Sequence, residues 1–553
     1  MAESVLTLFR RTALRLGGRA CFIYKDSAAQ TWKKLSWVET EDQVRRLSLG
    51  LAALGLKPGE AVGLISQTRL EWTLLDLAIM ACRGVTVPVY PTLAPDQTAY
   101  IIKDAKLRLL ILENQPQAER LKEILKDYSN QLIIIDSIEK LFEQGKSRPV
   151  NLYDENLRQI QPADLATIVY TSGTTGASKG VLLTHRNLLA EVRGLQQVFP
   201  FGPDTIGLMC LPLAHVIARA MQFFALAQGC QSAFAESLEK LPQNLKEVRP
   251  HFMAAVPRLL EKSHEKVQER LAQTSPLLKK MFFFPFLLAR KVRAGFGGRL
   301  KWIISGGAPL SKEIAQFFFQ MGILVLEGYG LTETFAAVTI NRPDDFRFGT
   351  IGKPLEGIRV KINAEGEIGV KGDTVFSGYL GLQGETEKSF DPEGWFLTGD
   401  IGEFTPDGFL KITDRKKDII VTSSGKNIAP QNIEGRLVQS PYIQQAFVYG
   451  DRQRFLSALV TLNWTAVEDF AKKEGIAVEA GEALAKNERI FQLIEGEIER
   501  INGSLSRFET VKKFAILPDN FSMESGELTP TLKIKRKVVA ERYKEILENF
   551  YQS

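Results

Sequence analysis

The stretch YTSGTTGASKG, residues 170–180, decides the fold and frames the chemistry of this chain. It continues an apolar run, 165–172, that is typical of a buried strand, and a helical pattern follows over 185–199. The junction between a strand and the next helix is where open α/β sheets bind ligands. Glycines let backbone N–H groups approach phosphate oxygens closely, and hydroxyls add further donors. The stretch therefore predicts an α/β fold with a phosphate-binding loop.

The loop differs from a Walker A loop, whose pattern is G-x-x-x-x-G-K-[ST]. Gly173 and Lys179 have the spacing of that motif, but Ser178 replaces its second glycine and Gly180 replaces its hydroxyl residue. The hydroxyl that binds magnesium in a Walker A loop thus has no counterpart at that position. The residues expected to contact phosphate are Thr171, Ser172, Gly173, Thr174, Thr175 and Lys179.

Neighbouring segments show the same alternation of strand and helix. A helical pattern covers 71–83, and apolar β-rich runs occupy 61–66, 84–90, 108–113 and 131–136. Strands that alternate with helices predict a parallel α/β sheet.

The pattern changes from residue 350 onward. Short strands with Gly, Asp and Pro turns over 366–372 and 394–415 predict antiparallel β structure. Amphipathic helices mixed with strands follow, and they close on a basic segment, 531–542. A boundary near Asp414 predicts one domain of residues 1–413 and a second of residues 414–553.

Composition excludes several classes of protein. A chain of 553 residues is too long for one core, and 44% hydrophobic with 24% charged residues is typical of a globular protein. A net charge of +6 without a dense basic stripe argues against nucleic acid as a partner. The four cysteines include no C-x-x-C pair, which predicts neither disulfides nor zinc and fits a reducing cytoplasm. Neither a signal peptide nor a membrane span is expected.

Four further stretches have residues that suit ATP. They are SGGAPL (305–310), LEGYGLTET (326–334), GWFLTGD (394–400) and DRKKDIIVTSSGKNIAP (414–430). Asp400 can accept hydrogen bonds from a ribose diol, and Glu333 is a hard oxygen ligand for Mg²⁺. Thr332 can donate to a phosphate oxygen, and Tyr329 can stack on adenine. The small residues expected to leave room for the ring are Gly306, Gly307, Ala308 and Gly328.

In order along the chain, these motifs resemble those of the adenylate-forming superfamily, which contains acyl-CoA synthetases, luciferases and peptide-synthetase adenylation domains. The likeness is strongest to long-chain fatty acyl-CoA synthetases and covers nearly the whole chain. Beyond the stretches already quoted, it includes LPLAHVIAR (211–219) and GELTPTLKIKR (526–536). The resemblance implies attack of a carboxylate on the α-phosphorus of ATP, loss of pyrophosphate, and displacement of AMP from the acyl-adenylate by a thiol.

The resemblance also implies the architecture and the cofactors. We expect an α/β protein whose large N-terminal domain contains stacked α/β sheets and a small β-barrel-like subdomain. A small, mobile α+β C-terminal domain should follow. The expected cofactors are ATP and Mg²⁺, the expected acid is a medium- or long-chain fatty acid, and CoA is the expected acceptor.

Five further residues receive roles by resemblance. Lys533 matches the adenylation lysine, which bridges the substrate carboxylate and the α-phosphate. Arg415 would bind the ribose beside Asp400, and Lys417 matches the hinge of the C-terminal domain. His215 would lie at the carboxylate end of the acyl pocket, and Arg219, four residues later, at a position that gates the tunnel.

Two alternatives stay open for the acceptor and the function. The hinge loop lines the thiol tunnel in the family, and it has Ser424, Gly425 and Lys426 where many members have two glycines. A serine there would narrow or re-route the tunnel, so the phosphopantetheine of an acyl carrier protein is a second possible acceptor. A more distant alternative is a non-catalytic lipid- or nucleotide-binding protein.

Residues 279–301 have seven Lys or Arg, no acid, and an apolar centre interrupted by Pro285. One interpretation is a helix that covers the core with its long basic side chains extended to water. The other is peripheral contact with an anionic membrane, at its inner face, where a lipid substrate would be delivered.

Overall fold

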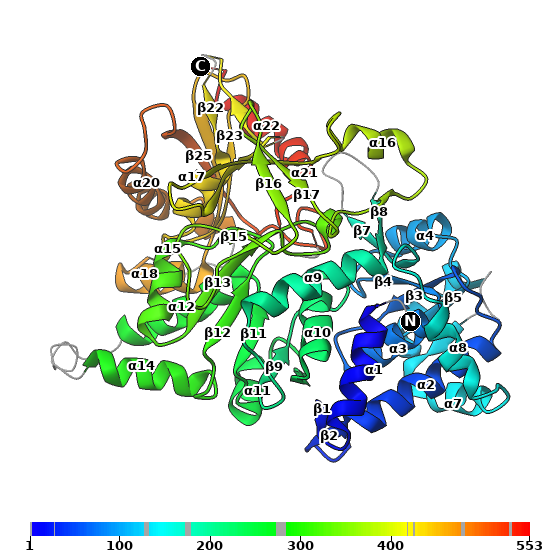
Figure 1. The fold of residues 1–553 in the computed structure, drawn as a ribbon. Coiled ribbons are helices and arrows are strands. Elements are labelled where there is room, and N and C mark those ends of the chain that lie inside the picture. The colour runs from blue at the N-terminus through cyan, green and yellow to red at the C-terminus, as the bar shows by residue number, and fades with distance from the viewer. Residues whose placement is uncertain are drawn as a thin grey trace.

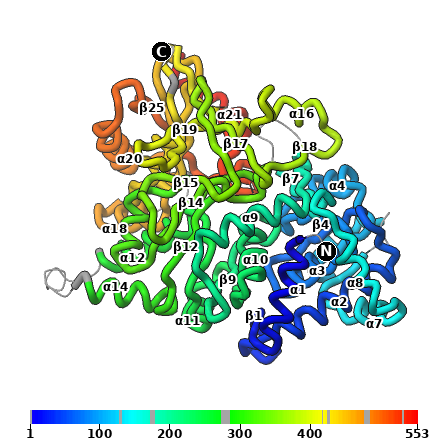
Figure 2. Tube along the Cα trace, in the orientation of Figure 1, coloured from blue at the N-terminus to red at the C-terminus, as the bar shows by residue number. Residues whose placement is uncertain are grey.

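The structure is a computed structural model of the chain. It describes residues 3–26, 28–126, 132–171, 178–272, 284–416, 418–423, 426–476, 482–529 and 533–552. Two α/β sheets form most of it, and the C-terminal residues form a further lobe beside them (Figure 1). In Figure 2 the yellow-to-red tube of that lobe lies above the green strands of the larger sheet.

The sheet nearest the blue and cyan helices of Figure 1 has seven strands in the order β18-β8-β7-β4-β3-β5-β6. The pairs from β7 to β6 are parallel, whereas β8 runs antiparallel to both β7 and β18. Its central strands are apolar and buried, as parallel strands covered on both faces are. The strands are β3 (Ala61–Ile65), β4 (Val85–Val89), β5 (Leu109–Leu112), β6 (Leu132–Ile134), β7 (Leu165–Thr171), β8 (Lys179–Thr184) and β18 (Gly378–Tyr379).

The second sheet has nine strands in the order β15-β14-β13-β12-β11-β9-β10-β1-β2. Six central strands are parallel neighbours, and antiparallel strands close both edges. The strands are β1 (Ala20–Lys25), β2 (Trp32–Ser36), β9 (Ile206–Met209), β10 (Gln231–Phe234), β11 (Phe252–Ala255), β12 (Trp302–Ser305), β13 (Leu324–Tyr329), β14 (Thr339–Ile340) and β15 (Lys353–Pro354).

Helices surround these sheets, and α9 and α10 lie between them in Figure 1. The helices are α1 (Val5–Leu16), α2 (Trp37–Ala53), α3 (Leu70–Ala81), α4 (Pro95–Asp104), α5 (Gln115–Arg120), α6 (Lys122–Leu125), α7 (Glu139–Gly145), α8 (Asn151–Gln159), α9 (His185–Val198), α10 (Val216–Gln228), α11 (Leu241–Val248), α12 (Pro257–Ala272), α14 (Phe284–Gly295) and α15 (Lys312–Gln320). A 3₁₀ turn, η2 (Ile135–Ser137), follows β6.

A buried ion pair joins elements of the two sheets. Arg219 in α10 donates from Nη2 to Asp76 Oδ1 at 2.7 Å and from Nε to Oδ2 at 3.1 Å, and both side chains are 1% exposed. Its Nη1 donates to the hydroxyl of Thr167, in β7, at 2.7 Å. Since a buried charge is tolerated only when it is paired and hydrogen-bonded, this contact fixes α10 against α3 and β7.

A smaller antiparallel sheet follows, in the order β16-β17-β19-β20. The register of its last pair changes once: Gly402 faces Ile412, whereas Ile401 faces Asp414 and Asp400 faces Arg415. One extra residue, Thr413, therefore forms a β-bulge in β20. The elements are β16 (Arg359–Ile362), β17 (Glu367–Lys371), α16 (Gln383–Lys388), β19 (Phe396–Phe404) and β20 (Leu410–Arg415).

The C-terminal lobe has a three-stranded sheet, β23-β24-β25, with helices around it and its own buried cores. The large core of the preceding region extends to Leu410, and the core of the lobe begins at Ile420. Its elements are β21 (Ile420–Val421), β22 (Asn427–Ile428), α17 (Pro430–Leu437), β23 (Ile443–Tyr449), β24 (Leu456–Leu462), α18 (Trp464–Lys473), α19 (Glu482–Ala485), α20 (Glu488–Asn502), β25 (Val511–Leu517), α21 (Arg536–Arg542) and α22 (Lys544–Asn549).

The predicted α/β class, with its large N-terminal region and small α+β C-terminal region, is confirmed. The antiparallel structure expected after residue 350 forms the open four-stranded sheet. Each of the five expected apolar strands is present, although the run at 131–136 ends early, at Ile134, where η2 begins. Among the described helices, none has the length and apolar character needed to cross a bilayer.

Candidate active site

The centre of the site is the buried carboxylate of Asp400, which is 3% exposed. Arg415, facing it across the β19–β20 pair, has its Nε 3.0 Å from Asp400 Oδ1. Tyr329, the last residue of β13, donates its hydroxyl to Oδ2 at 2.7 Å. Burial and the adjacent Asp400 charge raise the pKa of Tyr329 well above its ordinary value, so its proton stays on the phenol. Three segments that are distant in the sequence thus meet at one acid.

Glu333 lies in a 3₁₀ turn, η3 (Thr332–Thr334), that follows β13. The hydroxyl of Tyr379, in β18, donates to Glu333 Oε1 at 2.8 Å. Burial raises the pKa of Glu333, while the bond from Tyr379 and the positive charges of Arg415 and Lys179 act in the opposite direction. Proteins hold Mg²⁺ by one or two carboxylates together with substrate phosphates. A single half-buried acid with a hydroxyl residue, Thr332, beside it in the chain therefore fits this ion.

The turn that follows Glu333 is strained. Phe335 and Ala336 have φ values of +48° and +104°, in the region that side chains other than glycine rarely adopt. Gly330 closes the turn, because a Cβ at that position would lie 1.4 Å from the carbonyl oxygen of Ala336. The backbone N–H of Phe376 donates to the carbonyl oxygen of Glu333 at 2.7 Å. The backbone of Glu333 is therefore held from both sides.

Lys179 is the first residue of β8, and it pairs with Thr171 at the end of β7. Its Nζ lies 2.8 Å from Glu385 Oε2 and 5.0 Å from the ring centroid of Tyr379, over the ring face. Because Tyr379 also binds Glu333, Lys179 lies on the same side of the site as Glu333. The predicted phosphate contacts Ser172, Gly173, Thr174 and Thr175 lie outside the described residues.

The small-residue segments also meet. Gly306 and Gly307 directly follow β12, and Gly307 has a φ of +85°. A Cβ on Gly306 would lie 3.2 Å from the carbonyl oxygen of Gly328, in the neighbouring strand β13. Gly306, Gly307 and Ala308 thus lie beside the segment that carries Tyr329, as expected for one adenine site.

The C-terminal lobe contributes Lys533 to the site, and the N-terminal end of α10 contributes His215. Burial, and after it the charge of Arg415, lower the pKa of Lys533 to about 8. Burial likewise lowers the pKa of His215 to about 4, with the charge of Lys533 adding to the effect. The imidazole is therefore neutral, and its Nδ1 accepts the backbone N–H of Ile217 at 3.2 Å. Because Arg415 affects the pKa of Lys533, and Lys533 affects the pKa of His215, Lys533 lies near both residues.

The backbone of Lys533 is fixed by Thr529. The Lys533 N–H donates to the Thr529 hydroxyl at 3.0 Å, and the Thr529 N–H donates to the Lys533 carbonyl at 2.8 Å. The adjacent residues Leu528 and Ile534 form an antiparallel bridge. This bridge anchors the lysine to its lobe just where the lobe meets the site.

Comparison with known proteins agrees with this geometry. Residues 9–380 match the family described as AMP-binding enzyme, and residues 417–553 match the AMP-binding enzyme C-terminal domain. The chain belongs to the AMP-binding enzyme family. Among curated relatives of this AMP-binding enzyme, the long-chain-fatty-acid–CoA ligase FadD15 of Mycobacterium bovis is 34% identical, over 96% of this chain and 94% of the relative. Long-chain-fatty-acid–CoA ligase 5 of Rattus norvegicus is 32% identical, over 100% of this chain and 89% of the relative.

Solved structures agree on the fold. The adenylation domain of a carboxylate reductase from Mycobacterium chelonae superposes with a TM-score of 0.81, at 22% identity, over 100% of this chain and 91% of that one. The family match and the curated relatives confirm the predicted membership of the adenylate-forming superfamily.

Several predicted residues of this AMP-binding enzyme lie elsewhere or outside the described residues. Arg219 is enclosed in its ion pair with Asp76, so a gating movement would have to break three charged hydrogen bonds. Lys417, Ser424 and Gly425 are not described. Lys426 is exposed, and its Nζ lies 5.9 Å from the ring centroid of Phe508, over the ring face.

Two contacts at the site have no counterpart in the sequence analysis. Tyr379 binds Glu333 from β18, a strand of only two residues, which is too short to leave a periodic signal. Lys416 lies next to the predicted hinge, and its Nζ is 2.6 Å from Glu365 and 2.9 Å from Glu367. Glu367 in turn accepts the backbone N–H of Gly399, the neighbour of Asp400, at 2.9 Å. The charge run 414–418 was a usable signal for Lys416, but its acidic partners were not predictable.

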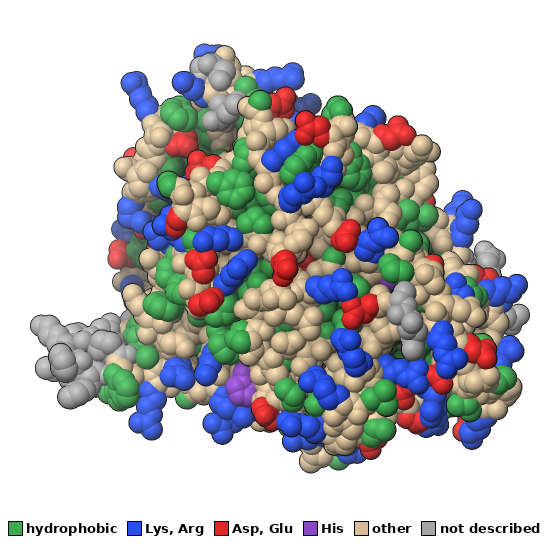
Figure 3. Space-filling view, in the orientation of Figure 1, with side chains coloured by type: hydrophobic (Ala, Val, Ile, Leu, Met, Phe, Trp, Pro, Cys, Tyr) green, Lys and Arg blue, Asp and Glu red, His purple; other side chains and the backbone are tan. Residues whose placement is uncertain are grey.

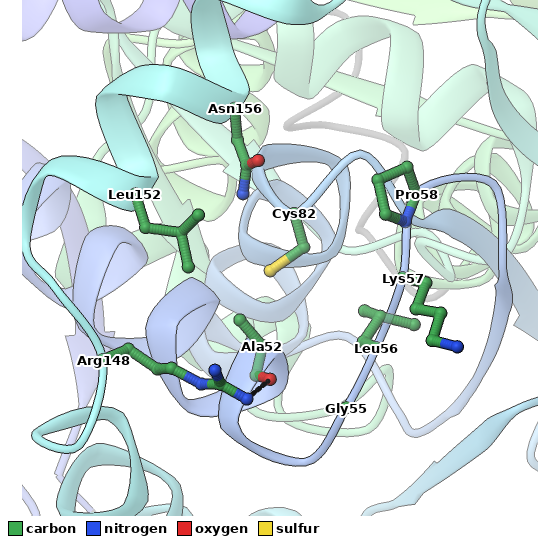
Figure 4. A pocket seen from close by; sticks show the side chains of 9 residues that line it. All are labelled: Ala52, Gly55, Leu56, Lys57, Pro58, Cys82, Arg148, Leu152 and Asn156. Carbon is green, nitrogen blue, oxygen red and sulfur yellow. Dashed lines mark hydrogen bonds between the residues drawn. The ribbon is translucent and has the colours of Figure 1, made fainter.

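A separate hollow of about 290 Å³ lies between the ends of α2, α3 and α8 (Figure 4). Arg148 at its edge donates from Nη2 to the carbonyl oxygen of Ala52 at 3.0 Å. Its lining contains no predicted site residue: Ala52, Gly55, Leu56, Lys57, Pro58, Cys82, Arg148, Leu152 and Asn156.

The pKa of Lys533 gives a pH dependence for adenylation. With a pKa of about 8, the ammonium is present below that pH and is lost as the pH rises through it. We expect kcat/KM for ATP–pyrophosphate exchange to fall above pH 8, because kcat/KM reports ionisation of the free enzyme. In Lys533→Arg the guanidinium does not lose its proton, so the fall should move to higher pH even if the rate is lower. An identical alkaline limb in both proteins would assign that ionisation to another group.

Proposed function

We propose that this AMP-binding enzyme activates a medium- or long-chain fatty acid in two steps within the one site. ATP and the acid give an acyl-adenylate and pyrophosphate, and CoA then gives the acyl thioester and AMP. The observation that carries this proposal is the convergence of Lys533, from the C-terminal lobe, on Arg415, Asp400 and His215. A protein that only bound a nucleotide or a lipid would not need a desolvated lysine at that junction.

Fatty-acid activation to acyl-CoA agrees with the family and with the relatives. The enzyme is an acid–thiol ligase that uses ATP, Mg²⁺ and CoA, in agreement with its family, with the CoA ligase names of the relatives and with similar structures that contain ATP and magnesium. Those names favour CoA over an acyl carrier protein as the acceptor.

The nucleotide would be held by residues of four segments. Asp400 and Arg415 would bind the ribose, and Tyr329 would stack on adenine beside Gly306, Gly307, Ala308 and Gly328. Thr332, Lys179 and the loop from Thr171 to Thr175 would contact the phosphates. Glu333 would hold Mg²⁺, which neutralises phosphate charge when it is bound.

Lys533 would act on charge that moves during adenylation. As the carboxylate oxygen bonds to the α-phosphorus, negative charge shifts from the acid to the phosphate and the pyrophosphate leaves. A fixed ammonium between the two groups stabilises that distribution without reorganisation. His215 is neutral at physiological pH and adds no second positive charge, so it can lie beside the acyl carboxylate as a polar wall.

The two half-reactions suggest two arrangements of the domains. We place the boundary between residues 413 and 414, which the separate cores before Leu410 and after Ile420 support. Lys417 would be the hinge, and Ser424, Gly425 and Lys426 would line the thiol tunnel after rotation. Arg219 would affect the acyl tunnel through α10.

The substrate and the acceptor can be tested together. Purified enzyme is assayed for pyrophosphate release with acids from acetate to eicosanoate, with CoA or a holo-acyl carrier protein as the acceptor. Each buried CH₂ contributes about 0.8 kcal/mol, so kcat/KM should rise steeply with chain length until the tunnel is full. Thioester should form with CoA. A flat profile, or a preference for acetate, would refute the proposed acid, and product formed only on the carrier protein would refute CoA.

Mutation should separate the two half-reactions. Lys533→Ala removes a positioned cation, and loss of one such donor costs roughly 10²–10³-fold in rate. We expect that loss in pyrophosphate exchange, with thioester formation from synthetic acyl-AMP and CoA largely retained. Lys537→Ala is the matched control, because Lys537 is exposed in the neighbouring helix α21 and should leave both steps unchanged. Equal loss of both steps in a folded Lys533→Ala protein would argue against separate arrangements.

We further propose a cytoplasmic protein that contacts the inner face of an anionic membrane through α14. All four cysteines, Cys21, Cys82, Cys210 and Cys230, are free thiols, which supports a reducing compartment. The outer face of α14 has Phe286, 68% exposed, and Leu287 beside exposed Arg290, Lys291 and Arg293. At this helix, Figure 3 shows green hydrophobic and blue basic side chains next to each other. Val292 is buried, so the opposite face packs on the protein.

Vesicle binding tests this contact. Each basic residue near an anionic surface contributes about 1 kcal/mol, so changing Arg290, Lys291 and Arg293 to Gln should weaken binding to phosphatidylserine vesicles roughly tenfold or more. Activity on a soluble short acid should be unchanged. The matched control changes three exposed lysines near the seven-stranded sheet to Gln: Lys122, Lys126 and Lys146. If the wild-type protein fails to bind such vesicles at low salt, or both triple variants behave alike, α14 is only a covering helix.

A further inference from the structure

Glu191 is a buried acid that the proposed reaction does not use. It lies in α9 and is 1% exposed. Its Oε1 accepts the backbone N–H of Ala337 at 2.9 Å, and its Oε2 has no hydrogen-bond partner among the described residues. Burial raises the pKa of Glu191 well above its ordinary value. A buried carboxyl group is costly to keep, so its single bond to Ala337 requires an explanation.

The partner of Glu191 lies at the end of the strained turn after the metal-binding residue. Ala337 directly follows Phe335 and Ala336, the two residues with positive φ, and Glu333 lies two residues before Phe335. Strained backbone of this kind persists only where surrounding contacts hold it. Glu191 supplies such a contact from a helix outside the turn.

The same face of α9 binds the segment on the other side of Glu333. Asn187, one turn before Glu191, donates from Nδ2 to the carbonyl oxygens of Asp373 and Val375, both at 2.8 Å. The next residue, Phe376, donates its backbone N–H to the carbonyl oxygen of Glu333. Residues four apart on a helix share a face. Asn187 therefore holds the segment 373–375, which leads to Phe376, and Glu191 holds Ala337, at the end of the turn after Glu333.

This helix is also directly connected to Lys179. The strand β8 runs from Lys179 to Thr184, and α9 begins at the next residue, His185. Thr184 and Asn187 form a capping box that fixes the junction. The helix is therefore one frame to which both the phosphate-binding lysine and the turn with Glu333 are attached.

We propose that Glu191 is a positioning residue for the magnesium–ATP site, which sets the place of Glu333 relative to Lys179 through its bond to Ala337. The inference rests on the proposed roles of Glu333 and Lys179. Glu191 does not touch a substrate. Its role requires one hydrogen-bond acceptor, Oε1, at a fixed distance from the helix backbone. The bond goes to the backbone N–H of Ala337, and Oε2 has no partner among the described residues.

Substitutions of Glu191 can distinguish the effect of the Oε1 acceptor from the effect of filling a buried space. Glu191→Gln keeps the Oε1 acceptor and the side-chain length. Glu191→Leu keeps the volume and removes the acceptor. Glu191→Asp keeps the acid but withdraws it by one CH₂, and serves if the leucine variant does not fold. Gln222→Leu is the matched control, since Gln222 is buried in α10 with its Oε1 unpartnered among the described residues.

The full-length enzyme is assayed by pyrophosphate exchange, with KM measured separately for MgATP, free Mg²⁺ and palmitate. A displacement of about 1 Å at a catalytic group can cost 10²-fold, so Glu191→Leu should raise the KM for MgATP roughly tenfold or more. The KM for palmitate, and thioester formation from supplied acyl-AMP and CoA, should stay unchanged. Glu191→Asp should show a smaller rise. Glu191→Gln and Gln222→Leu should keep the wild-type KM for MgATP.

Glu333→Gln in the same assay distinguishes the inference from the function on which it rests. If Glu333→Gln leaves the Mg²⁺ dependence unchanged, the proposed metal role fails, and the inference fails with it. If Glu333→Gln changes it but folded Glu191→Leu or Glu191→Asp does not, only the inference fails. Action through Glu333 further requires that Glu191→Leu combined with Glu333→Gln be no worse than Glu333→Gln alone. Additive losses, or a glutamine variant as poor as the leucine variant, would overturn the proposal.

Discussion

The site depends on one carboxylate that holds two different side chains at once. Asp400 binds Arg415, across its own hairpin, and Tyr329, at the end of the nine-stranded sheet. An unpaired buried carboxylate is strongly destabilising, so the hairpin and the sheet are coupled through this acid. Arg415 also acts on Lys533, which extends the coupling to the C-terminal lobe. The hairpin, the nine-stranded sheet and the C-terminal lobe therefore share a single electrostatic centre.

Positive charge accumulates around this centre. Burial of Lys533 and the charge of Arg415 lower the pKa of Lys533. Burial of His215 and the charge of Lys533 lower the pKa of His215 and favour its neutral form. Lys179 approaches from the other side, beside Tyr379. The reactants bring the missing anions, since the fatty acid has a carboxylate and ATP has its phosphates. Substrate binding would thus offset the repulsion between Lys533 and Arg415 that lowers the pKa of Lys533.

The sequence was informative where the signal is local. Buried parallel strands are short apolar runs, so β3, β4 and β5 could be located from composition and length alone. The motif residues Asp400, Glu333 and Lys179 have a type and a setting that fit phosphate chemistry. Contacts that depend on sheet order were not predictable. Tyr379 reaches Glu333 only because β18 pairs with β8, and Lys416 finds Glu367 only because β17 lies beside β19. The partner of Arg219, Asp76, likewise follows from how two layers stack. No local pattern marks Glu191, which resembles any polar residue within an amphipathic helix.

The bulge at Thr413 sets the register of the β19–β20 hairpin at the site. From Phe404 to Gly402 the two strands pair in one register, and the extra residue moves the remaining pairs by one. If Thr413 were instead paired with Ile401, continuation of that register would set Asp400 opposite Asp414 in place of Arg415. Two carboxylates would then face each other directly across the strands, an arrangement that destabilises a sheet. Closing the bulge without a change of chain length would therefore exchange an attractive pair for a repulsive one, whereas deletion of Thr413 would bring Asp414 next to Ile412 and keep Asp400 opposite Arg415. In evolution, the hazard at this hairpin is thus a slip of register and not the loss of one residue.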